Sequence, residues 1–378
     1  MYDKREITVF PYDSNALGLL LCKEFLDGYD VINLCTMRGW KNDVEMQEYK
    51  KYLYDKVEIN YGDSLEAYFN NSDTMLFIDS DHDISTGYYI YPQMYKAAIE
   101  GKNIIDLLEK NVIREDIEAI CKSKYGKYYH ADKSLDGLEL DKTDLKQGIS
   151  PIMTPIIAIV GEGESTQKFH LQELLRYELK NRGYSVVMIG SKPFSDFLGH
   201  YSFPIQLFRS QHSDREQIIL FNKYLRLIEA KHNPDIIILG IPGGVMKCTD
   251  IYCGDCGALA FKTFQAIKPD YVISSLFFAE YYPGFFNEFD SFARGRLDCE
   301  IDTFNIANRL IDWEELEGMY PDKVPLITVS DVLVTDTIQK MSKEDARNVI
   351  SISSRQNIKE LADKIIEKLG KEVAEIVF

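Results

Sequence analysis

The sequence predicts an α/β protein with two domains, each containing a mostly parallel sheet. Short apolar runs alternate with segments of helical periodicity along nearly the whole chain, which is the pattern of βα units. The chain has 378 residues, 45% of them hydrophobic, so its length suits two domains and its apolar content offsets chain entropy. We expect a Rossmann-like domain over 1–112, a connecting segment over 113–150 and a three-layer domain over 151–378.

In the first domain the apolar runs predict strands and the helical periods predict helices. The strands are expected at Ile7–Pro11, Val31–Cys35, Met75–Ile78 and Asn103–Ile105, and the helices at Asn15–Leu26 and Gln93–Glu100. The first strand opens into Pro11-Tyr-Asp-Ser instead of G-x-G-x-x-G, so a bound dinucleotide is not expected. The acidic stretch Asp79-Ser-Asp-His-Asp83 does not have the EF-hand pattern, which favours a solvated turn over a cation site.

The second domain shows the same alternation. Its strands are expected at Ile156–Val160, Ser185–Ile189, Ile236–Leu239, Val272–Leu276, Leu326–Val329, Val349–Ser351 and Val373–Phe378. One helix is expected at Lys168–Asn181, stopped by Gly183. A second helix follows Ser353 or Ser354 and ends before Gly370, with an apolar face of Ile358, Leu361, Ala362, Ile365 and Leu369.

Charge and cysteine content narrow the classes of partner and compartment. Lys plus Arg number 43 against 60 Asp plus Glu, which gives a net charge of −17. Such a chain is repelled by nucleic acid and by anionic lipid, so we expect neither as a partner. Seven cysteines, an odd number, and the absence of a signal-peptide core in Met1–Glu6 favour the cytoplasm.

The loop after Val160 has the composition of a phosphate cradle. A strand, a glycine-led loop, a lysine and a helix provide backbone N–H groups, a helix dipole and an ammonium group for an anion. The spacing from Gly161 to Lys168 is one residue longer than G-x-x-x-x-G-K-[ST]. We expect this loop to bind a nucleotide (ATP or GTP) or an acyl-CoA, with or without Mg²⁺. The expected ligand-binding residues are Gly161, Gly163, Ser165, Thr166, Gln167, Lys168, Phe169, Gly243 and Gly244.

The same loop departs from the phosphate-binding pattern. Gln167 stands in place of the glycine before the lysine, and Phe169 in place of the Mg²⁺-binding hydroxyl residue. No acid follows the expected strand Ile236–Leu239. Glu162 and Glu164 lie beside the expected phosphate position. Repulsion between a carboxylate and a phosphate about 4 Å apart would cost a few kcal/mol unless these side chains turn outward. A strand–turn–helix without ligand is therefore the alternative, and Gly243 and Gly244 then form a tight turn.

Two resemblances fit this organisation. The run Gly161–Gln172, with the segments leading to Gly183 and Ser191, resembles the P-loop domain of D-glutamate N-acetyltransferase-type proteins, in which a Rossmann-like domain comes first. The chain from Ile7–Tyr12 through Gly39-Trp40 and Pro234–Gly244 to Lys268–Asp270 resembles accessory proteins of clostridial ribosomal-peptide maturation.

The second resemblance implies a role beside a radical-SAM maturase or a precursor peptide. An N-acyltransferase or ATP-dependent ligase, and a non-catalytic peptide-binding or partner-binding module, are the alternatives. A homo-oligomer stays open, and no catalytic residue is assigned.

Two further segments carry candidate chemistry. Cys248, Cys253 and Cys256, with Cys299 further on, have a spacing suited to an iron–sulfur cluster or zinc, although free cysteines are favoured because the loop is acidic. If no metal is bound, the Cys256 thiol is expected to be reactive because it lies at the start of a helix. The aromatic run Phe277–Phe289 lines a ligand or peptide pocket, or packs as core.

Overall fold

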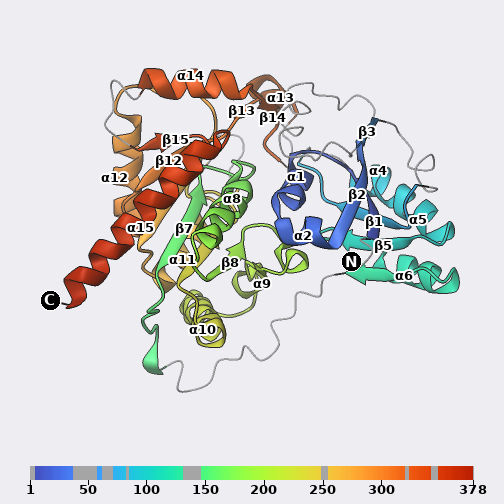
Figure 1. Cartoon of the computed structure of the whole chain (residues 1–378), viewed down its shortest axis with the longest axis horizontal. Coiled ribbons are helices and arrows are strands. Elements are labelled where there is room, and N and C mark those ends of the chain that lie inside the picture. Colours follow the sequence, from blue (N-terminus) through green and yellow to red (C-terminus); the bar gives the residue numbers. More distant parts are fainter. Residues whose placement is uncertain are drawn as a thin grey trace. The chain divides into compact units, whose positions relative to one another are not determined.

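The chain forms two units, each with its own sheet. The computed structural model describes residues 5–36, 58–61, 71–81, 85–130, 146–247, 254–319, 323–341 and 348–377. Unit 1 is Met1–Asp132 with Asp196–Gly199, and unit 2 is Lys133–Ser195 with His200–Phe378. Both main sheets are parallel and carry helices on their faces (Figure 1), which confirms the predicted α/β class.

Unit 1 has a six-stranded sheet in the order β3-β2-β1-β4-β5-β6, with every pair parallel. This is the strand order of a Rossmann fold, so the Rossmann-like prediction is confirmed. The strands are β1 (Arg5–Phe10), β2 (Tyr29–Thr36), β3 (Glu58–Tyr61), β4 (Thr74–Ile78), β5 (Asn103–Leu107) and β6 (Tyr128–His130). The helices are α1 (Ser14–Leu21), α2 (Lys23–Gly28), α4 (Thr86–Tyr89), α5 (Tyr91–Ile99) and α6 (Arg114–Ser123).

Two features of unit 1 differ from the expected elements. The helix expected at Asn15–Leu26 is divided into α1 and α2 by Cys22, whose backbone is extended. In addition, α6 and β6 fall in the expected connecting segment but belong to unit 1. There β6 pairs with β5, and Ile117 and Cys121 of α6 enter the core under α5.

The carboxyl end of β1 holds a carboxylate at the start of α1. One oxygen of Asp13 accepts from the backbone N–H of Asn15 at 2.8 Å, and the other accepts from the Ser80 hydroxyl at 2.7 Å and from the Asp81 N–H at 2.8 Å. In dinucleotide-binding Rossmann folds a pyrophosphate lies at this helix end. Here a side chain of the chain itself occupies that position. His82 and Asp83 lie outside the described residues.

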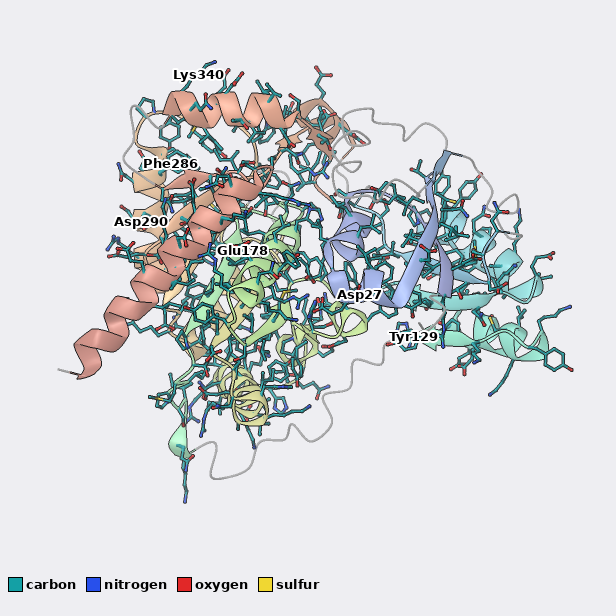
Figure 2. The ribbon with its side chains drawn as sticks, in the orientation of Figure 1. Asp27, Tyr129, Glu178, Phe286, Asp290 and Lys340 are labelled. Carbon is teal, nitrogen blue, oxygen red and sulfur yellow. The ribbon has the colours of Figure 1, made fainter. Side chains whose placement is uncertain are left out.

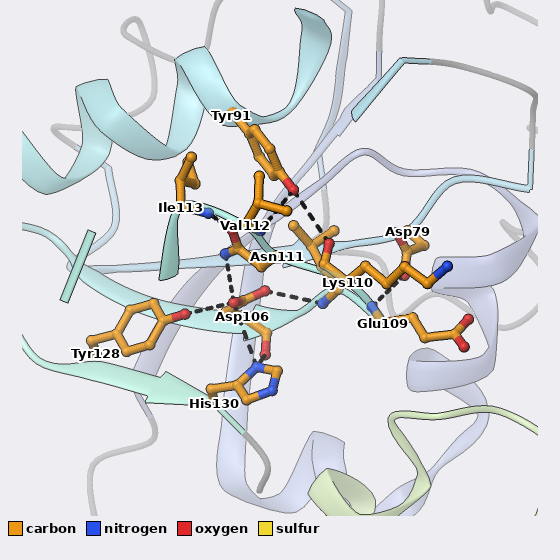
Figure 3. A network of polar contacts seen from close by, with 11 residues as sticks. Asp79, Tyr91, Asp106, Glu109, Lys110, Asn111, Val112, Ile113, Tyr128 and His130 are labelled. Atoms are coloured by element: carbon orange, nitrogen blue, oxygen red, sulfur yellow. Dashed lines mark hydrogen bonds and ion pairs between the residues drawn. The ribbon is translucent and has the colours of Figure 1, made fainter. Parts of the chain in front are cut away.

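A buried carboxylate also organises the ends of β5 and β6 (Figure 3). Asp106, which is fully buried, accepts hydrogen bonds from the Tyr128 hydroxyl at 2.6 Å, the Asn111 amide at 2.8 Å and the Leu108 N–H at 3.0 Å. The His130 ring lies 3.5 Å away. Burial raises the pKa of Asp106, but these hydrogen bonds outweigh it and hold the pKa below its ordinary value.

Unit 2 has a seven-stranded parallel sheet in the order β15-β12-β11-β7-β10-β8-β9 and a separate antiparallel pair, β13-β14. The main strands are β7 (Ile156–Gly161), β8 (Val186–Gly190), β9 (Tyr201–Ser202), β10 (Ile236–Gly240), β11 (Tyr271–Leu276), β12 (Thr303–Ile306) and β15 (Val349–Ile350). The pair is β13 (Arg309–Ile311) with β14 (Leu326–Thr328), so the strand expected near Leu326 lies outside the main sheet.

Helices cover both faces of this sheet and give it three layers. On one face α8 packs against β7, β8, β10 and α15, and on the other α10, α11 and α12 enclose the main apolar core. The helices are α8 (Lys168–Asn181), α9 (Ile205–Phe208), α10 (Asp214–His232), α11 (Ala258–Ala266), α12 (Phe285–Leu297), α13 (Trp313–Met319), α14 (Asp331–Met341) and α15 (Arg355–Val377). The short helix η2 (Ser195–Leu198) falls mostly in the segment Asp196–Gly199, which belongs to unit 1.

The C-terminal prediction was partly wrong. The expected apolar face is present, since Ile358, Leu361, Ala362, Ile365 and Leu369 are all buried. The helix does not stop at Gly370 but continues to Val377, so the strand expected at Val373–Phe378 is absent from the described residues. An interior glycine costs a helix only about 1 kcal/mol, which the flanking helix formers offset. Within the described chain, every helix is too short or too polar to traverse a bilayer.

Replacement of Asp106 by Asn is expected to destabilise unit 1 by about 2 kcal/mol at pH 7, because an amide loses charge-assisted hydrogen bonds and brings a donor against donors. Because the folded pKa is depressed, the carboxylate stabilises the fold above the unfolded pKa, and this contribution disappears as pH falls through the folded pKa. Urea unfolding should therefore show the wild-type advantage shrinking below about pH 4. Asp116→Asn is the control, because this exposed carboxylate accepts from the Tyr95 hydroxyl at 3.3 Å, and equal effects of both variants would contradict the prediction.

Candidate functional site

The β7–α8 loop (Glu162–Gln167) lies at the carboxyl edge of the unit 2 sheet. All six residues of β7 are buried, and α8 begins at Lys168, as predicted. Ser165 and Gln167 have left-handed backbones, with φ of 57° and 60°. Two such residues in one short loop turn the chain sharply and bring it back over the end of β7.

Lys168 lies inside this turn and not on its surface. The residue is 3% exposed, and its ammonium donates to the Gly163 carbonyl at 2.7 Å and to the Gly243 carbonyl in a short contact. Burial lowers the pKa of Lys168, although the Glu164 carboxylate beside it acts in the opposite direction. The ammonium is therefore enclosed by main-chain oxygen atoms from two loops.

Glu162 and Glu164, the acidic residues near Lys168, both accept hydrogen bonds from backbone N–H groups of other segments. Glu162 is partly buried, and its carboxylate accepts from the Phe277 N–H at 3.1 Å, at the end of β11. Burial raises the pKa of Glu162. Glu164 accepts from the Gly243 N–H in a short contact, and another of its oxygens lies 3.9 Å from the Lys168 ammonium. Both carboxylates thus contribute to the loop's own hydrogen bonding.

Gly243 and Gly244, after β10, are packed directly against the β7–α8 loop. The Val245 N–H donates to the Gly161 carbonyl at 2.9 Å. A Cβ at Gly244 would lie 2.5 Å from the Glu162 carbonyl oxygen, and Gly243 has φ of +79°. Only glycines permit this close approach. The β7–α8 loop and the segment with Gly243 and Gly244, both predicted to bind a ligand, are therefore in direct contact.

The remaining loop side chains make internal contacts. Thr166 donates to the Gly163 carbonyl at 3.2 Å, and the Gln167 side-chain oxygen accepts from the Asn308 N–H at 3.2 Å. Phe169 is buried, with its ring 5.3 Å from that of Phe194. The position of a Mg²⁺-binding hydroxyl is therefore occupied by a core side chain.

Four polar residues next to the loop were not singled out from the sequence: Asp255, Ser275, Asn305 and Asn308. The Ser275 hydroxyl donates to the Thr166 carbonyl and accepts from the Asn305 amide at 2.7 Å. Asp255 caps α11 through the Leu259 N–H at 3.1 Å, and a Cβ at Gly243 would touch its carboxylate. A polar residue near the carboxyl end of the expected strand Val272–Leu276 was the signal that could have identified Ser275, whereas Asn305 lies on β12 (Thr303–Ile306), for which the sequence predicted no strand.

Of the four candidate metal-binding cysteines, the structure describes Cys256 and Cys299. Cys248 and Cys253 lie outside the described residues. Cys256 is exposed, and its carbonyl accepts from the Arg296 guanidinium at 2.8 Å. Burial raises the pKa of the Cys299 thiol to about 12, so without a metal this side chain is a neutral thiol.

The aromatic run contributes mainly to the core. Phe286 and Phe289 are buried on α12, with rings 4.9 and 5.7 Å from that of Phe304 on β12. Phe286 and Asp290 project from the same helix (Figure 2). Tyr282, at 53% exposure, is the exception among the large side chains of this run. Of the two interpretations left open by the sequence, core packing accounts for these buried rings.

Comparison with known proteins adds one informative structural similarity. No family model and no curated protein matches the chain. A crystal structure of a DUF1611 family protein from Anabaena variabilis aligns over 96% of this chain and 100% of its own, with a TM-score of 0.62 and 11% identity. At that identity the similarity concerns the fold alone. The WlbA dehydrogenase from Bordetella pertussis, solved with NADH and UDP-GlcNAcA, aligns over 44% of this chain and 46% of its own at 12% identity. Its TM-score of 0.27 is too low to indicate a shared fold.

The substitution Gly161→Ala is expected to destabilise unit 2 by about 1–3 kcal/mol, because overpacking a closed site forces its neighbours to move. The new Cβ would lie 2.5 Å from the Thr166 hydroxyl oxygen and 2.8 Å from the Gly163 carbonyl oxygen. Gly370→Ala is the control, since its Cβ would meet nothing within 4 Å and alanine favours a helix. Thermal unfolding should separate the two variants, and an equal melting temperature for both would refute the close packing of this loop.

Proposed function

We propose that unit 2 binds a small phosphate-bearing or other anionic ligand at the β7–α8 loop. The observation that carries the proposal is the Lys168 ammonium, buried at the carboxyl edge of a parallel sheet and in contact with two glycine-containing loops. Burial of an ammonium costs free energy that hydrogen bonds and a nearby opposite charge must offset, which favours a function that a neutral side chain could not perform. Recognition of an anion is such a function.

The position of the loop in the sheet supports this proposal. From β7 the chain crosses to β8 on one side, returns through β10 beside β7, and then crosses to β11 on the other side. Open α/β sheets bind ligands where the strand order reverses in this way, outside the carboxyl ends of the strands. The start of α8 adds N–H groups without helical acceptors and the positive end of a helix dipole.

The donor set favours binding over nucleotide hydrolysis. A phosphoryl-transfer site usually positions Mg²⁺ with a loop hydroxyl and a strand-end acid. Phe169 packs in the core at the hydroxyl position, and the residues after β10 are Ile241, Pro242 and glycines. The residues of this loop that the structure describes therefore suit an anion held by N–H groups and one lysine.

We further propose the biological setting that the sequence resemblance implies, an accessory role in the maturation of a ribosomally synthesised peptide. The ligand-binding unit would then act beside a radical-SAM maturase or a precursor peptide. An acyl-CoA would place its phosphates at the same loop, so an N-acyltransferase is tested by the same measurement. Co-purification with a precursor peptide tests the setting separately from the ligand.

Thermal unfolding with Mg-ATP, Mg-GTP, acetyl-CoA and inorganic phosphate tests the binding proposal. A ligand at about 100 times its Kd stabilises unit 2 by about 2.7 kcal/mol, which corresponds to roughly 5–10 °C. Lys168→Met should abolish the shift, whereas Lys180→Met, an exposed lysine of the same helix, should preserve it. No shift with any of the four compounds, or a shift that survives Lys168→Met, would refute the proposal.

A further inference from the structure

Glu164 has a carboxylate in the position that an anionic ligand needs. One of its oxygens accepts from the Gly243 N–H, and another lies 3.9 Å from the Lys168 ammonium. Main-chain N–H groups and ammonium groups are among the donors that bind a phosphate or carboxylate oxygen. The side chain of Glu164 thus makes, within the chain, the contacts that we assign to a ligand.

This contact also accounts for the buried charge of Lys168. A buried ammonium needs both hydrogen-bond acceptors and a nearby negative charge. The carbonyls of Gly163 and Gly243 provide the acceptors, and Glu164, to a larger extent than Asp255, provides the negative charge. A ligand that takes over the charge compensation can therefore replace Glu164 without leaving the lysine uncompensated.

The two acidic residues of the loop differ in how easily they can move away. The Glu164 side chain is 48% exposed, so rotation into solvent is open to it. Glu162 is instead partly buried and held by the Phe277 N–H at 3.1 Å. Glu164 is displaceable and Glu162 belongs to the fixed framework.

We infer that Glu164 is an internal competitor, which occupies the anion position in the free protein and must leave when an anionic ligand binds. The inference rests on the proposed function of this loop and adds how the site is regulated. The measured binding free energy is then the intrinsic binding free energy of the site, made less favourable by the free energy needed to displace Glu164. The ligand must also bring its own negative charge to Lys168, which excludes neutral ligands from this position.

Titration with sodium phosphate and with sodium acetate, at constant ionic strength, tests this inference. Glu164→Gln keeps the side-chain shape and removes the competing charge, so its affinity for phosphate should rise roughly 5-fold. Glu164→Ala vacates the position, so its melting temperature should fall by a few degrees and recover with phosphate or acetate. Glu360→Gln, which removes an exposed charge from α15, should behave as wild type.

The outcomes separate this inference from the proposed function. If wild type binds phosphate and Glu164→Gln binds it no more tightly, the inference is wrong and the proposed function stands. If wild type shows no binding but Glu164→Ala or Glu164→Gln is stabilised by either anion, the inference is supported and the proposed function of the natural loop is not. If no variant responds to either anion, the inference is overturned. Should Glu164→Ala fail to fold, the Glu164→Gln titration decides alone.

Discussion

The Lys168 ammonium is the constraint around which the carboxyl edge of unit 2 is built. A cation removed from water needs oxygen atoms on several sides, and here they come from Gly163 on one loop and Gly243 on another. To bring both carbonyls to one nitrogen, the loops must touch, and they do so through glycines that leave no room for a Cβ. The contact between the two loops, the glycines at that contact and the placement of Glu164 are all linked to this one group.

The two units share a feature at the helix that follows their central strand. In unit 1 the Asp13 carboxylate receives the first N–H groups of α1, and in unit 2 the Glu164 carboxylate lies beside the lysine that opens α8. They differ in exposure, because Asp13 is buried with both oxygens bonded, whereas the Glu164 side chain is half exposed. Asp13 caps α1 directly, whereas Glu164 contacts Lys168 and the Gly243 N–H and does not cap α8.

Local sequence signals predicted most strands of the two main sheets and the helices α8 and α15, but not the helices α10, α12 and α14. The bounds of α8 were predicted because a glycine-led loop precedes it and Gly183, with φ of +92°, follows it. The strand β12 was missed because Thr303 and Asn305 interrupt its apolar pattern, although both are fully buried in the sheet. Their hydroxyl and amide groups are satisfied by distant partners such as Ser275 and Tyr271, which no local window contains.

The candidate site was predictable in its membership but not in its contacts. Gly161, Gly163 and Lys168 lie in one continuous run, so composition alone identified them. The pairing of Lys168 with Gly243 joins residues 75 positions apart, and that of Gln167 with Asn308 joins residues 141 apart. Glu162 accepts from the Phe277 N–H and Glu164 from the Gly243 N–H, both distant in the sequence, so the sequence predicted only that these carboxylates would be costly unless they turned outward.

The short strands at the two ends of the unit 2 sheet have a consequence for solubility. Both β9 and β15 contain only two residues, and the chain after β15 continues as the helix α15 instead of adding another strand. A short outer strand offers few unpaired backbone groups to a strand from another molecule. Edge-to-edge aggregation of this sheet is accordingly disfavoured.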